Sequence, residues 1–145
     1  MTIGRLLASR DVAIVTCPAD ARVSTAAAIL AERRIGALPV VADGRDGQVL
    51  GIFSERDLLY RIAADGAAAL DRPVRDVMTA PALSVTSETT VLAALSLMTR
   101  RRIRHLPVID NGRMVGFVSI GDLVKVRIER IEAEAEAMRS YIQTA

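Results

Sequence analysis

Aromatic residues are scarce in this chain of 145 residues, which has no tryptophan, two tyrosines and two phenylalanines. Modules that bind single-stranded nucleic acid by stacking bases on aromatic side chains are therefore not indicated. An excess of one charge is also lacking, because 19 Lys and Arg against 17 Asp and Glu leave a formal net charge of +2. A surface that holds a polyanion by charge alone is therefore not expected.

Cysteine and long apolar runs are equally scarce. Cys17 is the single cysteine, so an intrachain disulfide and a multi-cysteine zinc site are excluded. No run of about 18 apolar residues argues for a membrane-spanning helix. Residues 1–10 lack the apolar core and the small-residue cleavage site of a signal peptide. We therefore expect a soluble cytoplasmic protein without a membrane partner.

Common catalytic motifs are missing as well. The chain contains neither G-x-x-x-x-G-K-[ST] nor G-x-G-x-x-G, the glycine-rich patterns of nucleotide-dependent enzymes. One histidine and one cysteine, with no base close in sequence, do not make a nucleophilic triad. No His or Cys pair has metal-ligand spacing. We therefore expect no enzyme, no metal and no required cofactor.

An internal repeat is the strongest positive signal. A shift of 68 residues places Val23 on Val91 and keeps many identities through residues 23–41 and 91–109. After a turn that is three residues longer in the first copy (residues 42–47 against 110–112), a shift of 65 places Gly51 on Gly116. Each copy is too short to bury enough apolar surface to be stable alone. We therefore expect the copies to pack together about a pseudo-two-fold axis.

Each copy predicts the order β-α-β-β-α, an α/β (α+β) fold. Apolar residues at helical spacing predict a first helix at 23–33 and at 91–101. Strands are predicted at 13–17, 37–41 and 48–53, and at 82–85, 105–109 and 114–119, with a second helix starting at Ser54 or Ser119. The expected boundaries are a first repeat at 10–66, a connector at 67–76, a second repeat at 77–130 and a C-terminal helical extension at 131–145.

The best-matched segments carry a family resemblance. They read IGALPVV (35–41) with GIFSERDL (51–58), and IRHLPVI (103–109) with GFVSIGDL (116–123). In these segments the chain resembles the tandem CBS-domain pair, or Bateman module. The resemblance implies a regulatory module that binds AMP, ADP, ATP or a related adenosine compound, with NAD and S-adenosylmethionine as further candidates. It also implies action on a separate partner protein, because no residues remain for a catalytic barrel or a channel.

The doubled Ser-x-x-Asp motif has two interpretations. As a capping box, Ser54 and Asp57, or Ser119 and Asp122, would satisfy the free N–H groups at the start of a helix. As a ligand site, the helix N-terminus would hold a phosphate, and the carboxylate would accept the hydroxyls of a ribose. The resemblance assigns the Asp to the ribose and the Ser to the neighbourhood of the phosphate.

Basic residues distinguish the two copies. Arg104 and His105 begin a strand at a place where the resemblance implies contacts to phosphate, whereas the aligned Gly36 and Ala37 carry no charge. We therefore expect unequal sites, with the better phosphate site in the second copy. Arg56 either compensates partly in the first copy or is simply solvated. The arginines at 100–102 are expected only to complement the dipole of the preceding helix.

The resemblance groups the candidate ligand residues by copy. The apolar candidates are expected mainly to form the hydrophobic core. The resemblance also implies that the first strand of each copy borders the adenine through its backbone. Cys17 aligns with Val85, so a buried thiol is favoured over a reactive one. The predicted first site contains Thr16, Cys17, Ile35, Gly36, Ala37, Pro39, Ser54, Arg56 and Asp57. The predicted second site contains Ser84, Val85, Ile103, Arg104, His105, Pro107, Ser119 and Asp122.

The C-terminal region carries a separate signal. Apolar residues recur at alternating steps of four and three, as in a coiled-coil seam: Val124, Ile128, Ile131, Ala135, Met138 and Ile142. This helix either packs on its own domain or forms a homodimer contact, which we favour. Two other functions stay open, a ligand-independent interaction module and, with less support, a nucleic-acid binder that uses the basic segment 100–105.

Overall fold

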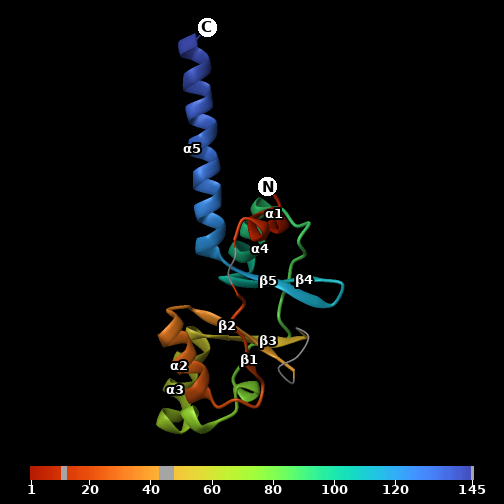
Figure 1. Ribbon diagram of the computed structural model, residues 1–145. Helices are drawn as coiled ribbons and strands as arrows, with labels where there is room; N and C mark the ends of the chain where they lie inside the picture. The colour runs from red at the N-terminus through yellow and green to blue at the C-terminus, as the bar shows by residue number, and fades with distance from the viewer. Residues whose placement is uncertain (11–12, 43–47, 145) are drawn as a thin grey trace.

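Two α/β units and a projecting helix make up the molecule (Figure 1). The structure is a computed structural model that describes residues 1–10, 13–42 and 48–144. Most of the longer turn of the first copy, residues 43–47, lies outside the described residues. The two units stack on one another, and both copies of the repeat have the predicted mixed α/β character.

The first unit has a three-stranded sheet covered by two helices. In chain order its elements are β1 (Cys17–Pro18), α2 (Val23–Arg33), β2 (Ala37–Val41), β3 (Val49–Ser54) and α3 (Glu55–Asp65). β2 lies between β1, which is parallel to it, and the antiparallel β3. Apolar residues of α2 bury against the sheet at the predicted helical spacing. The central members of this core are Val23, Ala26, Leu30, Leu38, Val40 and Phe53.

The second unit repeats this plan with one difference. Its elements are α4 (Val91–Arg101), β4 (His105–Asp110), β5 (Arg113–Ser119) and α5 (Ile120–Thr144). β4 and β5 form a hairpin whose tight turn uses Asn111 and Gly112 at positive φ, 52° and 76°. In place of β1 there is a single parallel bridge between Val85 and Val108.

The first strand of each copy is shorter than predicted. In residues 13–17 and 82–85, only Cys17 and Val85 pair with another strand. The apolar residues Ile14 and Val15 that favoured a strand are instead half-buried in the wall of a pocket. An apolar run therefore marked burial at these positions, but not sheet pairing.

The segment that leads into each repeat packs on the other repeat. An N-terminal helix, α1 (Ile3–Ala8), buries Ile3 and Leu6 in the core of the second unit. The connector forms two short 3₁₀ helices, η1 (Gly66–Asp71) and η2 (Val74–Asp76), and buries Val74 and Val77 in the core of the first unit. Helix α1 was not predicted, although its apolar residues have helical spacing after Thr2, whose side chain caps it.

Two equivalent glycines make this crossed packing possible. A Cβ built on Gly51 would lie 2.6 Å from the backbone oxygen of Thr79 and 2.9 Å from the sulfur of Met78. A Cβ on Gly116 would lie 2.5 Å from a methyl carbon of Leu7. Each glycine sits within a strand, where the missing side chain lets the segment entering the other repeat approach closely.

Helix α5 extends far beyond its own unit (Figure 1). Leu123 is buried near its start, whereas every residue from Ile128 to Thr144 is exposed. Among the described residues, none of the helices combines the length and the apolarity needed to cross a bilayer.

Candidate functional site

Two pockets of ligand size lie where the repeats meet. The first, of about 360 Å³, contains Ser54 and Asp57 and is called the Asp57 pocket here. The second, of about 570 Å³, contains Ser119 and Asp122 and is called the Asp122 pocket. Both volumes fall within the roughly 300–1,000 Å³ of ordinary small-molecule sites.

Each pocket combines segments from both repeats. In the Asp57 pocket, the Ser-x-x-Asp motif of the first repeat meets Pro81–Leu83 and Arg102–His105 of the second. In the Asp122 pocket, the motif of the second repeat meets Ala13–Val15 and Arg34–Ala37 of the first. The shift of 68 residues relates these segments pairwise, so the two pockets are pseudo-symmetric. The grouping therefore differs from the expected one, which placed each site within one copy.

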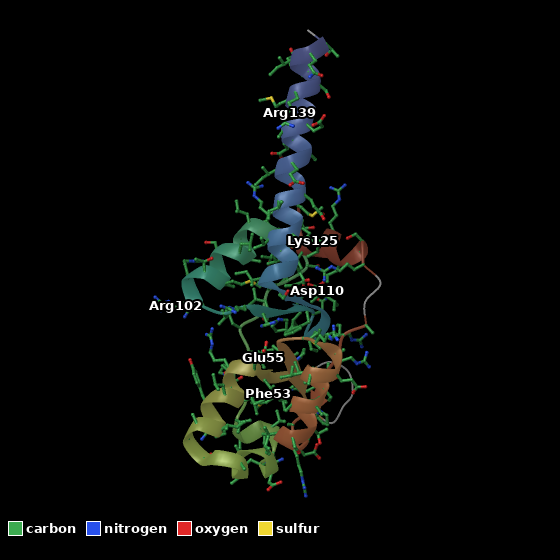
Figure 2. All side chains as sticks on the ribbon, turned by 90° about the vertical axis from the view of Figure 1, so that its left-hand side faces the viewer. Phe53, Glu55, Arg102, Asp110, Lys125 and Arg139 are labelled. Carbon is green, nitrogen blue, oxygen red and sulfur yellow. The ribbon has the colours of Figure 1, made fainter. Side chains whose placement is uncertain are left out.

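Strand register explains why these segments face one another. Ala37 pairs with Ser54 across β2 and β3, and His105 pairs with Ser119 across β4 and β5. The beginning of one strand and the beginning of the following helix therefore lie at the same end of each unit. The two units meet at these ends, and Figure 2 shows Glu55, the first residue of α3, on the side of the first unit that faces the second.

The Asp57 carboxylate is held by three donors. The backbone N–H and the hydroxyl of Ser54 donate to Oδ2 at 2.9 and 3.0 Å, and the hydroxyl of Thr79 donates to Oδ1 at 2.9 Å. The Asp57 N–H donates in return to Oγ of Ser54 at 3.2 Å, which completes the capping box. The capping interpretation is therefore correct for this motif. It leaves the pocket side of the carboxylate available, because each oxygen can accept more than one hydrogen bond.

Asp122 has a different set of partners. Its Oδ2 accepts the Ser119 N–H at 2.8 Å, and its own N–H donates to Oγ of Ser119 at 3.1 Å. Its Oδ1 forms an ion pair with Arg10 at 3.2 Å. Burial raises the pKa of Asp122, but the hydrogen bonds from Ser119 and the charge of Arg10 outweigh this effect and hold the pKa below its ordinary value. The Asp122 carboxylate is therefore ionised, and the positive charge of Arg10 balances its negative charge.

Cations are concentrated in the Asp57 pocket. Its lining includes Arg56, Arg102 and Arg104, with Glu55 as the opposing charge beside Asp57. The lining of the Asp122 pocket includes Arg10, which pairs with Asp122, and Arg34. Arg104 was grouped with Asp122 on the basis of the sequence, but it lines the pocket of Asp57. The Asp57 pocket therefore contains more arginines than the Asp122 pocket, whereas the sequence led us to expect the better phosphate site beside Asp122.

His105 lies between the two pockets and lines both. Its ring stacks on Phe117 with centroids 5.7 Å apart and an interplanar angle of 12°. Burial lowers the pKa of His105, Asp122 and Glu55 act to raise it, and Arg104 lowers it further, with a net decrease. The imidazole is therefore neutral near pH 7 and offers one donor and one acceptor to this junction.

Gly36 lies beside His105, between the two pockets. A Cβ built on Gly36 would lie 2.7 Å from Oε1 of Glu55 and 3.3 Å from Cε1 of His105. The absence of a side chain here brings the two repeats together closely enough for Gly36 to line both pockets.

Several predicted ligand residues line neither pocket. Cys17 and Pro39 are buried in the first unit, and Val85 and Pro107 are buried in the second. Burial also raises the pKa of the Cys17 thiol to about 11, which fits a structural rather than a reactive cysteine. Outside both linings are Thr16, Cys17, Pro39, Ser84, Val85 and Pro107. Ile35 and Ala37 line the Asp122 pocket, and Ile103 lines the Asp57 pocket.

Sequence reasoning missed Thr79, Arg10 and the two entry segments that line the pockets. The signal was present in Gly51 and Gly116, which align in the repeat and indicate a close backbone approach within a strand. The residues that approach them, Met78 and Leu7, come before the first strand predicted for the other repeat. Within the described part of the chain, no group of three or more His, Cys, Asp or Glu side chains is placed to hold a metal ion.

The fold and the paired pockets define a tandem-repeat module with two pseudo-symmetric pockets between its repeats. The CBS domain family matches residues 7–64 and 74–129, and the chain belongs to this family. A structure of the CBS-domain containing protein ATU1752 from Agrobacterium tumefaciens is 39% identical, with a TM-score of 0.81 over 87% of this chain and 92% of that one. The mitochondrial CBS domain-containing protein CBSX3 of Arabidopsis thaliana is 39% identical over 93% of this chain and 66% of its own length.

Two more distant structures of the family contain adenosine compounds. The CBS domain pair of MJ0100, 21% identical with a TM-score of 0.75 over 87% of this chain and 98% of that one, is in complex with 5-methylthioadenosine and S-adenosyl-L-methionine. CBSX2, 24% identical with a TM-score of 0.73 over 88% of this chain and 96% of that one, is in complex with AMP. The chain spans less than two thirds of CBSX3 and about a quarter of another Arabidopsis relative, CBSCBSPB1.

Proposed function

We propose that the protein is a regulatory module that binds an adenosine nucleotide in the Asp57 pocket. One observation carries this proposal, namely the position of the Asp57 carboxylate in a pocket that three arginines also line. A nucleoside phosphate presents a diol that needs an acceptor and a phosphate that needs cations. The Asp57 pocket offers both kinds of group.

The geometry suggests a role for each group. The carboxylate of Asp57, oriented by Ser54 and Thr79, would accept the ribose hydroxyls. The exposed N-terminus of α3 and Arg104 would stabilise the phosphate. The apolar side chains of Ile52, Pro81 and Ile103 would border the base. The AMP and S-adenosylmethionine complexes of relatives agree with this class of ligand.

Isothermal titration calorimetry with AMP, ADP, ATP, NAD, S-adenosylmethionine and adenosine tests the proposal. We expect at least one phosphate-bearing ligand to bind with a dissociation constant below about 1 mM, the weak end of specific affinities. Inosine monophosphate serves as a matched control for the base. The proposal fails if none of these compounds binds at millimolar concentration while the protein is folded.

We propose a regulatory rather than a catalytic role, exerted on a separate protein, and a homodimeric assembly through α5. The exposed seam of α5 supports the assembly, since a C₂ dimer covers it with a second copy of the same face. The cytoplasmic location expected from the sequence stays a prediction. Size-exclusion chromatography with light scattering tests the assembly independently of any nucleotide.

A ligand-independent interaction module is the second candidate. The observation that favours it is the engagement of both carboxylates by their own chain, Asp57 by Thr79 and Asp122 by Arg10. In this case the Ser-x-x-Asp motifs act only as helix caps. Dimerisation and partner capture that are unchanged by nucleotide, together with a failed titration, would support this alternative.

A further inference from the structure

The distal part of α5 has no tertiary partner within its own chain. All residues from Ile128 to Thr144 are exposed, and Figure 2 shows Lys125 near the body of the molecule and Arg139 far out along the helix. In proteins most of the stability of a helix comes from the packing of its apolar face rather than from the intrinsic propensity of its residues. This projecting segment therefore needs a partner for its apolar face.

The seam of α5 lies on a different side from the residues that bind the helix to its own unit. Leu123 is buried in the core of the second unit, and Val126 packs against this core. At about 3.6 residues per turn, Val126 lies on the opposite side of the helix from Val124. Ile128 is 50% exposed and Ile142 is 70% exposed. Packing on its own unit therefore does not account for the seam.

Heptad positions can be assigned from the seam. Ile128, Ala135 and Ile142 occupy position a, and Val124, Ile131 and Met138 occupy position d. The flanking e positions are then Lys125, Glu132 and Arg139, and the flanking g positions are Arg127, Glu134 and Tyr141. Charges at e and g select the orientation and the partner of a coiled coil.

A parallel pair of α5 helices brings opposite charges together. In this arrangement, each g residue faces the e residue five positions later in the partner helix. Arg127 then faces Glu132 of the partner subunit, and Glu134 faces Arg139 of the partner subunit. Symmetry doubles both pairs, so four attractive contacts flank the seam.

An antiparallel pair brings like charges together. The register that matches all six seam layers places Val124 opposite Ile142. Lys125 then faces Arg139, while Glu132 and Glu134 each face their own counterpart in the second copy. Like charges directly across an interface are unfavourable, so this arrangement is selected against.

We propose that α5 pairs with α5 of a second copy in a parallel, in-register, two-stranded coiled coil. This inference rests on the homodimer proposed above, and it does not depend on the nucleotide pocket. The intrahelical ion pairs Arg130–Glu134 (3.3 Å) and Glu136–Arg139 (3.5 Å) do not oppose it, because such exposed pairs contribute little. Four glutamates against two arginines in residues 128–144 make an anionic membrane surface a poor alternative partner.

The orientation places both copies of the globular body at the same end of the coil. A parallel two-fold axis runs along the coil, so the two bodies emerge side by side from the N-terminal ends of their α5 helices. An antiparallel pair would place the two bodies at opposite ends.

Disulfide trapping of single-cysteine substitutions tests the orientation. In the full-length protein, Ile131→Cys places two thiols at the same d layer, and oxidised glutathione should link them into a covalent dimer. Ala133→Cys is the matched control, because position f points away from the seam. The native Cys17 is buried, and the wild-type chain checks that it stays unreactive. In an antiparallel pair, residue 131 meets residue 135, so a mixture of Ile131→Cys and Ala135→Cys proteins would give the mixed dimer instead.

Charge reversal gives an independent readout by sedimentation equilibrium. Glu132→Arg should weaken dimerisation roughly tenfold, because it opposes Arg127 of the partner subunit in two symmetric places. Arg127→Glu combined with Glu132→Arg should restore the affinity. Glu129→Arg changes the same charge at position b and should leave the affinity within about twofold.

The outcomes separate this inference from the other proposals. Trapping at 131 but not at 133, with loss and rescue by charge reversal, supports the parallel coil. A mixed 131–135 dimer, a dimer indifferent to Glu132→Arg, or a monomer at tens of micromolar overturns it. A monomer also removes the proposed homodimer, whereas a dimer of another geometry leaves the homodimer intact. Nucleotide titration of each variant reports only on the Asp57 pocket.

Discussion

The Asp57 and Asp122 pockets have equivalent backbones but different chemistry. Both pair a Ser-x-x-Asp helix start with the entry segment of the other repeat. The side chains differ, since Arg104 lines the Asp57 pocket whereas the equivalent residue in the Asp122 pocket is Gly36. In addition, Arg10 forms an ion pair with Asp122. A duplicated fold therefore preserves the position of a pocket, while single side chains give the two pockets different arginines and ion pairs.

Replacement of each carboxylate by alanine should give the largest difference in nucleotide affinity between the two pockets. Asp57→Ala should weaken nucleotide binding roughly 10- to 100-fold, because a hydrogen bond to a charged group contributes about 1.5–3 kcal/mol. Asp122→Ala should change binding less than about threefold, because Arg10 already engages that carboxylate. Calorimetry with the nucleotide that binds best measures both effects.

The two alanine variants are matched controls for folding. Each loses the acidic member of a helix cap, the carboxylate that accepts the N–H of Ser54 or Ser119, at a cost of about 1 kcal/mol in the free energy of unfolding. Thermal unfolding of both proteins should therefore shift by similar amounts. Equal losses of binding in the two variants would show that the pockets are not unequal in the way proposed.

Substitution of Arg104 sharpens the contrast in phosphate recognition. Arg104→Gln should weaken AMP binding roughly tenfold, because a charge-assisted contact to phosphate is replaced by a neutral one. Adenosine, which lacks the phosphate, should be affected less than about twofold. Arg34→Gln removes a cation from the lining of the Asp122 pocket and serves as the control. Similar losses for AMP and adenosine would mean that Arg104 does not contact the phosphate.

Loss of the ion pair between Arg10 and Asp122 should make the nucleotide affinities of the two pockets more alike. Arg10→Gln breaks the ion pair with Asp122 and should tighten binding in that pocket roughly fivefold, since a partly exposed pair is worth about 1 kcal/mol. The calorimetric stoichiometry should then rise toward two ligands per chain. Arg5→Gln removes an exposed cation from α1, which precedes Arg10 in the chain, and should change neither value. A stoichiometry unchanged by Arg10→Gln would contradict this account of the Asp122 pocket.

The smallest expected effect concerns pH and the residue shared by both pockets. Burial lowers the pKa of His105 in the folded state, so the unfolded chain binds a proton more readily. The free energy of unfolding should therefore decrease as the pH falls below about 6.5, the ordinary pKa of histidine. His105→Gln should flatten the profile between about pH 5.5 and pH 7.5, because the chain has no other histidine. A wild-type stability that is constant over this range would exclude a neutral, buried His105.

Local patterns predicted the secondary structure well. The predicted helices 23–33 and 91–101 coincide with α2 and α4, because apolar spacing and helix ends depend on neighbouring residues. The hairpin strands were correct to within about a residue or two for the same reason. Helix α1 was missed, since six residues are stabilised mainly by burial of Ile3 and Leu6 against a distant part of the chain.

The composition of the pockets could be predicted only in part. The Ser-x-x-Asp motifs were found, because a helix cap and a ligand-binding carboxylate share the same local pattern. The assignment of Arg104 to Asp122 differs from its place beside Asp57, because the repeat alignment does not say which end of one unit faces the other. Only the aligned glycines Gly51 and Gly116 indicated that the entry segments cross.

Helix α1 has a consequence for how the chain folds. The N–H of Ile3 donates to the carbonyl of Thr89 at 2.8 Å, so the two contacting residues enclose the whole first repeat in one loop. Closing so long a loop is entropically costly and slow, and the contact gains nothing until the second core has formed. Neither folded unit is formed by one contiguous piece of chain, because each core includes residues from the segment that leads into the other repeat. The two repeats should therefore unfold in one cooperative transition, and a cut between them should leave both halves without part of their interiors.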